Sequence, residues 1–166
     1  TNSTVSPMLY PHRPALEFVS LNPYRIKVTG RTKHFISAFG EHVIGKEVET
    51  AMNEVAPAFG AEVVEFTVAP QVAPPEGGLP YHQWLVEFSQ LPQDMAGFSA
   101  ALDQAVIQQN VYYRDLIDGK ILRPLVVTPL PPDSFRNYMR SLGKLGGQNK
   151  VPRLSDNRKI ADALLS

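Results

Sequence analysis

The sequence contains no cysteine among its 166 residues. This absence excludes disulfide bonds, thiolate nucleophiles and cysteine-ligated metal centres, and it agrees with the reducing environment of the cytoplasm, where we expect the protein to act. Long apolar runs are absent as well, since none approaches the roughly 20 residues that a membrane-spanning helix needs. The first residues lack the basic and then apolar pattern of a signal peptide. We therefore expect no membrane partner.

A net charge is also absent. The 16 basic and 16 acidic side chains cancel, and the isoelectric point is about 6.8. A balanced surface has no general attraction for a phosphate backbone, so we expect no nucleic-acid partner. With 43% hydrophobic and 19% charged residues, the composition is typical of one globular domain.

The common catalytic motifs are missing too. The chain has neither a G-x-S-x-G nucleophile elbow nor a Walker phosphate loop. Its four histidines have no metal-binding spacing, and we expect structural or solvent roles for them: His12, His34, His42 and His82. The residues alone do not predict an isolated enzyme.

Hydrophobic periodicity predicts the regular structure. An apolar stripe with helical spacing runs from Ile44 to Phe59, with Glu47 and Glu49 in the first turns, where the helix dipole favours carboxylates. Alternating apolar residues predict a hairpin of strands 64–68 and 84–88. Further elements follow from the same criteria: strands 15–20, 25–29, 35–38 and 125–128, and helices from Asp94, Asp133 and about Asn157. This order predicts an α+β fold in which helices pack on a small, largely antiparallel sheet.

Two loops combine glycine with cations, at residues 30–33 and 143–153. Glycine allows the backbone to approach a ligand closely, and a cation attracts an anionic group. The same composition also suits a tight turn and a linker with solvated lysines. The residues alone leave both interpretations open.

The first of these loops opens a longer motif. Residues 30–49, GRTKHFISAFGEHVIGKEVE, resemble the hinge motif of the adenylate-forming superfamily, which includes acyl-CoA synthetases, peptide-synthetase adenylation domains and luciferases. The residues in register are Gly30, Arg31, Ile36, Gly40, Glu47, Val48 and Glu49. Lys33 stands at the hinge position, where aspartate is common, and His34 follows where a second aspartate is more usual.

Further segments narrow the resemblance to the C-terminal domain of auxin-responsive-promoter-type acyl acid amido synthetases, and to bacterial members most. They are YHQWLVEFS (81–89), NVYYR (110–114), Pro124-Leu125, Pro132 with Phe135, and QNKVPR (148–153). The resemblance covers about residues 15–160. It implies that residues 1–14 are a lead-in or a cloning remnant, that 15–29 end the large domain, and that 30–166 form the C-terminal lid domain.

The resemblance implies a two-step ligase reaction. ATP with Mg²⁺ activates a small carboxylic acid as an acyl-adenylate, and the amine of an amino acid then forms the amide and releases AMP. The lid rotates about its hinge between the two half-reactions. Because the N-terminal adenylation domain holds the main substrate pockets, we expect this chain to need that domain as its partner. Alone, it is expected to be inactive and to bind no cofactor.

Three residues receive roles from the resemblance. Arg31 would contact the ribose or phosphate of the nucleotide, and Lys33 would be the hinge residue. Lys150 would be the mobile lysine that neutralises charge on the α-phosphate and the carboxylate during adenylation. The usual P-K-x-x-x-G-K form is absent, so Lys144 remains an alternative for this lysine. No metal ligand is expected in this chain.

Several alternatives stay open. The chain resembles, at the hinge, a lid of a phenylacetate-type acyl-CoA ligase, and it could also be a stand-alone α+β interaction module without chemistry. Tyr113 and Arg114 either anchor the sheet or face the acceptor amine. The face that a lid turns to its large domain would be exposed in an isolated chain, and a homodimer through that face is a further open alternative.

Overall fold

The computed structural model describes residues 14–21, 24–31, 35–36, 38–144 and 150–166, with side chains from residue 36 onward. Its central feature is a three-stranded sheet of β5 (Glu62–Gln71), β6 (Tyr81–Gln90) and β7 (Val126–Leu130) in the order β5-β6-β7. β5 and β6 form the predicted antiparallel hairpin, with Val68 opposite Trp84. β7 lies parallel to β6, with Val127 beside Trp84, because the helices between them return the chain to the same end of the sheet.

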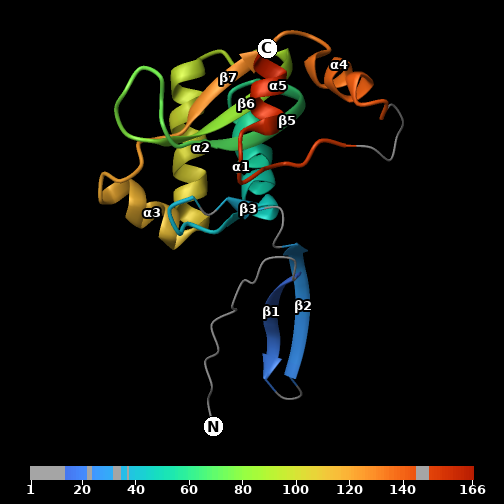
Figure 1. Ribbon diagram of the computed structural model, residues 1–166. Helices are drawn as coiled ribbons and strands as arrows, with labels where there is room; N and C mark the ends of the chain where they lie inside the picture. Colours follow the sequence, from blue (N-terminus) through green and yellow to red (C-terminus); the bar gives the residue numbers. More distant parts are fainter. Residues whose placement is uncertain (1–13, 22–23, 32–34, 37, 145–149) are drawn as a thin grey trace.

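Helices cover both faces of this sheet (Figure 1). α1 (Gly45–Ala58) and α2 (Met95–Gln109) share one hydrophobic core with Phe66 and Trp84. The neighbouring Leu85 belongs to a second core with residues of α4 (Ser134–Ser141) and α5 (Lys159–Leu165). Successive residues of a strand point to opposite faces, and with helices on both faces β6 is buried without interruption from Tyr81 to Glu87. The predicted α+β fold is thus confirmed.

The two helices against the first core follow the predicted pattern. In α1 the buried positions include Val48, Met52 and Val55, and the helix ends one residue after Pro57. α2 begins after Asp94, whose carboxylate accepts a hydrogen bond from the Gly97 N–H at 3.0 Å. A side-chain oxygen at this position satisfies one of the free N–H groups of the first turn. The start of α2 at Asp94 is therefore as predicted.

One helix was not predicted. α3 (Val111–Asp118) follows α2 after the single residue Asn110. The Asn110 side-chain oxygen accepts a hydrogen bond from the Tyr113 N–H at 2.9 Å and so starts the new helix. Its eight residues include a valine and two tyrosines, which are weak helix formers, so the periodicity of so short a segment is not distinctive.

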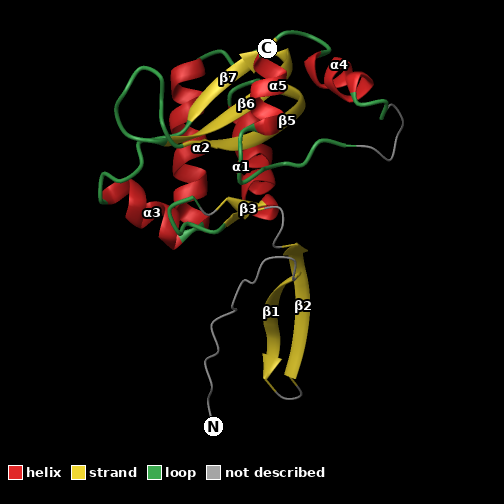
Figure 2. Ribbon diagram, in the orientation of Figure 1, coloured by secondary structure: helices red, strands yellow, loops and turns green. Residues whose placement is uncertain are grey.

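The remaining described strands form two small sheets, drawn in yellow in Figure 2. β1 (Pro14–Leu21) pairs antiparallel with β2 (Tyr24–Arg31), as the prediction of strands 15–20 and 25–29 requires. β3 (Phe35–Ile36) pairs with β4 (Val43–Ile44), directly before α1. The predicted third strand is therefore confirmed at its start, and β4 was not predicted.

A buried carboxylate from the central strand fixes the start of α4. Glu87 of β6 is only 6% exposed, and its two oxygens accept hydrogen bonds from the N–H groups of Asp133 at 3.1 Å and Phe135 at 3.2 Å. A negative charge is favourable at this end of a helix. The carboxylate of a distant strand therefore performs the task of a local N-cap.

Replacing Glu87 by alanine removes the acceptor from both N–H groups. We expect Glu87→Ala to lower the free energy of unfolding by about 1–3 kcal/mol, since buried donors without a partner are costly. Glu87→Gln keeps one carbonyl oxygen in place and is expected to lose less. Urea unfolding of the three proteins measures the difference, and a stability of Glu87→Ala equal to that of the parent would show that α4 does not depend on this contact.

Candidate functional site

The residues of the predicted QNKVPR motif that the structure describes begin an edge segment, residues 150–155, beside β5. The Val68 N–H donates to the Arg153 carbonyl at 2.8 Å, and the Ser155 N–H donates to the Val68 carbonyl at 2.9 Å. The Thr67 hydroxyl donates to the Pro152 carbonyl at 2.7 Å. The edge segment therefore lies along β5 and forms one parallel bridge with it, between Leu154 and Val68.

The side chain of Arg153 ties the edge segment to two other elements. Its Nε donates to the Glu49 carboxylate of α1 at 3.0 Å, and its Nη1 pairs with the Glu65 carboxylate of β5. The guanidinium carbon also lies 4.6 Å from the centre of the Phe66 ring, at the distance of a cation–π contact. We call Arg153, Glu49, Glu65 and Phe66 the Arg153 cluster.

This cluster joins the two motifs that were noticed separately in the sequence. Glu49 closes the hinge-like motif, and Arg153 closes the QNKVPR motif, 104 residues later. Glu49 was predicted as a carboxylate of the first helical turns, and it does lie near the start of α1. Its partner was not predicted, because nothing in a single sequence signals which cation meets an exposed glutamate across the fold.

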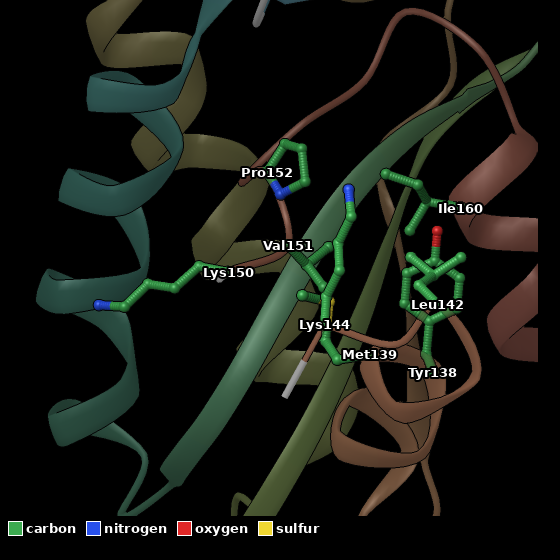
Figure 3. Close-up of a pocket in the computed structure, with 8 residues that line it drawn as sticks. All are labelled: Tyr138, Met139, Leu142, Lys144, Lys150, Val151, Pro152 and Ile160. Carbon is green, nitrogen blue, oxygen red and sulfur yellow. The ribbon is translucent and has the colours of Figure 1, made fainter. Parts of the chain in front are cut away.

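The two candidate lysines, Lys144 and Lys150, flank a shallow hollow of about 360 Å³ next to the edge segment. It lies between α4, α5 and the edge segment, and its lining residues are Tyr138, Met139, Leu142, Lys144, Lys150, Val151, Pro152 and Ile160. Both lysines are exposed to solvent. Figure 3 shows the Lys150 side chain directed away from that of Lys144 and from the group around Tyr138.

Lys150 has an exposed side chain, and its backbone is attached to a buried residue. The next residue, Val151, is buried in the second hydrophobic core, and Leu154 is buried in the first. Among the described residues, neither Lys150 nor Lys144 has a carboxylate partner. An exposed ammonium on a fixed backbone can reach phosphoryl or carboxylate oxygens of a ligand.

The other two predicted site residues lie at the margin of the described structure. Arg31 is the last residue of β2, where its backbone pairs with Pro14. Its side chain and the whole of Lys33 lie outside the described residues. The nucleotide-contacting role of Arg31 and the hinge role of Lys33 therefore stay predictions.

A second polar cluster is buried between the helices and β6. Glu41 is completely buried, and its carboxylate lies 3.3 Å from His82 Nε2 while accepting the Phe39 N–H at 3.0 Å. The His82 ring in turn packs on Tyr113, with ring centres 5.2 Å apart. The structural role predicted for the histidines fits His82.

Tyr113 resolves one of the open alternatives. Its ring is completely buried, and its hydroxyl donates a 2.6 Å hydrogen bond to Asp103 of α2, which also accepts the Leu125 N–H. Tyr113 therefore anchors α3 within the core, whereas Arg114 is exposed beside Asp115. Burial, reinforced by the Asp103 carboxylate, raises the pKa of the Tyr113 hydroxyl well above its ordinary value of 10.0.

The start of α1 contains a related buried group. Burial raises the pKa of the Glu47 carboxyl above its ordinary value of 4.5, although hydrogen bonds from the Ile44 N–H at 3.0 Å and the Asn110 amide at 3.2 Å partly oppose this effect. Glu47 was predicted to be a carboxylate of the first helical turns. The structure confirms this position and shows that Glu47 also joins α1 to the start of α3.

The described part of the chain contains no cluster of three or more histidine, aspartate or glutamate residues that could hold a metal ion. No helix in the described ranges is long and apolar enough to span a bilayer.

Comparisons with known proteins identify relatives of this domain. The model of the GH3 family C-terminal domain matches residues 46–159. A structure of GH3.15 acyl acid amido synthetase superposes with a TM-score of 0.67 at 16% sequence identity, over 92% of this chain. A structure of AtGH3.15 acyl acid amido synthetase in complex with 2,4-DB gives a TM-score of 0.66 at 15% identity, again over 92%.

These structural matches show a shared fold. The chain spans 29% of the length of each of the two matched structures. Comparison with curated protein sequences gave no match. The family match confirms the resemblance to the C-terminal domain of acyl acid amido synthetases.

The Tyr113–Asp103 hydrogen bond predicts a specific pH dependence. We expect Tyr113→Phe to cost about 1 kcal/mol of folding free energy at pH 7, where the bond is intact. The raised folded-state pKa contributes stability that is complete below about pH 10 and is lost as the pH rises further, because only the unfolded tyrosine then releases its proton. The stability gap between parent and variant should therefore narrow from pH 9 to 11. Urea unfolding at both values tests this, and a constant gap would contradict it.

Proposed function

The chain belongs to the GH3 family, as its C-terminal domain, and from this membership we propose that it is the mobile lid of an ATP-dependent acyl acid–amino acid ligase. In the intact enzyme the lid would act on a site of the N-terminal adenylation domain. The observation that carries the proposal is the geometry at Lys150, an exposed ammonium next to the buried Val151 and the hydrogen-bonded edge segment. This arrangement gives the lysine a defined position from which to reach an anionic substrate.

The chemistry of the available donors suits a nucleotide substrate. ATP would supply the adenylyl group that activates the carboxylic acid, because attack of the carboxylate on the α-phosphorus forms the acyl-adenylate and releases pyrophosphate. Lys150 would donate hydrogen bonds to oxygens of the α-phosphate and the attacking carboxylate, where negative charge accumulates in the transition state. Arg31 would hold the ribose or a phosphate, and Lys33 would change its backbone angles as the lid rotates. We propose that Mg²⁺ accompanies the ATP phosphates and is held by the large domain.

The domain limits belong to the same proposal. Residues 30–166 would form the lid, residues 15–29 would end the large domain, and residues 1–14 would be a lead-in or a cloning remnant. The hydrogen-bonded pair β1 and β2 agrees with structured linker strands in the second of these ranges. A bacterial source, the cytoplasm as the site of action and self-association of the isolated lid are further parts of the proposal.

Two other functions make different predictions. A lid of a phenylacetate-type CoA ligase would share the adenylation step but deliver the acyl group to a thiol. A stand-alone interaction module would catalyse nothing, with or without another domain. The amide ligase is preferred because the family match covers residues 46–159, well beyond the hinge-like motif.

The role of Lys150 can be tested in the intact protein. We expect Lys150→Ala to reduce acid-dependent ATP–pyrophosphate exchange by about 100- to 1,000-fold, which is the usual effect of removing one donor that stabilises transition-state charge. Lys144→Ala is the matched control on the other side of the hollow and should have a smaller effect. The reverse order would assign the role to Lys144. The 166-residue chain alone should show no exchange, and robust AMP formation by it would contradict the proposal.

The acceptor distinguishes the ligase from the CoA ligase. With an acyl acid and ATP, the intact protein should form an amide with amino acids and release AMP, while coenzyme A should give no thioester. Product analysis by mass spectrometry over a panel of amino acids measures this. Thioester formation without amide would instead support the phenylacetate-type enzyme.

A further inference from the structure

We infer that Arg153 is a positioning residue for Lys150 and makes the lysine part of the same rigid unit as α1, the helix in which the hinge-like motif ends. This inference rests on the proposed function, because it concerns how the lid presents its lysine. It assigns a task to a residue that touches no substrate.

The guanidinium of Arg153 contacts two carboxylates and a backbone carbonyl within the domain. It pairs with Glu49 and with Glu65, and its Nη1 also donates to the Phe66 carbonyl at 3.4 Å. Its carbon faces the Phe66 ring, which stacks on Trp84 with ring centres 5.5 Å apart. Two carboxylates already neutralise this cation, so Arg153 is poorly placed to bind a phosphate. Its effect on a substrate must pass through another residue.

The backbone connects Arg153 to Lys150. The Arg153 carbonyl accepts the Val68 N–H, and the Pro152 carbonyl accepts the Thr67 hydroxyl. These contacts and the buried Val151 fix the chain up to the residue after Lys150. The Arg153 side chain adds charged contacts from the same short segment, and its loss would leave the backbone of Lys150 held mainly by the contacts of Val151 and Pro152.

Glu49 connects the Arg153 cluster to α1. It lies near the start of α1, which begins directly after β4 and whose first residues are the last ones of the hinge-like motif. A rotation at the hinge moves α1 first, because α1 is the first long element after it. The Arg153–Glu49 pair, at 3.0 Å, transmits this movement directly to the edge segment, in addition to the path through the sheet. A lysine that must reach an α-phosphate needs such a link, since a displacement of about 1 Å can cost roughly 100-fold in rate.

The test uses the intact enzyme and two separate assays. ATP–pyrophosphate exchange reports adenylation, and amide formation from a chemically prepared acyl-adenylate reports the second step. We expect Arg153→Ala to lower exchange by about 10- to 100-fold, with little change in the second step. Arg153→Lys should not restore exchange, because an ammonium lacks the planar fork that binds two carboxylates.

A double-mutant cycle separates positioning from general loosening of the fold. If Arg153 acts through Lys150, the double variant Lys150→Ala/Arg153→Ala should be no slower in exchange than Lys150→Ala alone. Independent structural damage would instead multiply the two losses and overturn the inference. Loss of exchange in Lys150→Ala with unchanged exchange in Arg153→Ala would overturn this inference alone. Unchanged exchange in Lys150→Ala would overturn the role proposed for that lysine first.

Arg158 offers a matched control. It also joins the C-terminal part of the chain to the sheet, through Gln83 at 2.8 Å and the Pro70 carbonyl at 3.3 Å, and it pairs with Asp162. Arg158→Ala should therefore loosen α5 but leave exchange close to that of the parent. If Arg153→Ala does not fold, Glu49→Gln replaces it in the same cycle, since this half-exposed residue keeps its size and loses only its charge. A loss of exchange that is non-additive with Lys150→Ala supports the inference, and parental exchange in Glu49→Gln overturns it.

Discussion

The burial of both faces of β6 is the constraint on which the rest of the domain depends. Trp84 and Val86 fill one core and Leu85 fills the other, so helices must lie on both sides of a sheet of only three full strands. α1 and α2 supply the first cover, while α4, α5 and Val151 supply the second. The position of Lys150 follows from this second layer, because the residue next to it is part of that core.

Each of the buried charged groups in this domain connects two or more elements of the fold. Glu87 contacts the start of α4, Asp103 joins α2 to Tyr113 and Leu125, and Glu41 of the hinge-like motif contacts His82 of β6. A buried polar group without partners would be costly, and these partners come from different elements. The polar contacts therefore define how the helices are placed on the sheet, in addition to the non-directional packing around them.

A lid of the kind proposed above, which would rotate as a unit, must not bend between its hinge and its reactive residue. The Arg153 cluster meets this requirement by joining α1, β5 and the edge segment within a few side chains. The exposed part of each charge is screened by solvent, so the cluster is better suited to fix a geometry than to add much stability. The cluster therefore serves mainly to hold the edge segment in a fixed orientation relative to α1 and β5.

The sequence by itself determined the local elements and the family. Period-two alternation predicted β5 and β6, the apolar stripe predicted α1, and Asp94 predicted the start of α2. Each of these signals is contained within a few neighbouring residues. The short helix α3 was not predicted from the sequence, because its start depends on the Asn110 side chain and on burial of Tyr113. Only the tertiary structure decided that β7 runs parallel to β6, that Glu87 begins α4 and that Glu49 meets Arg153. These contacts join residues tens of positions apart, and their geometry exists only once the layers have packed.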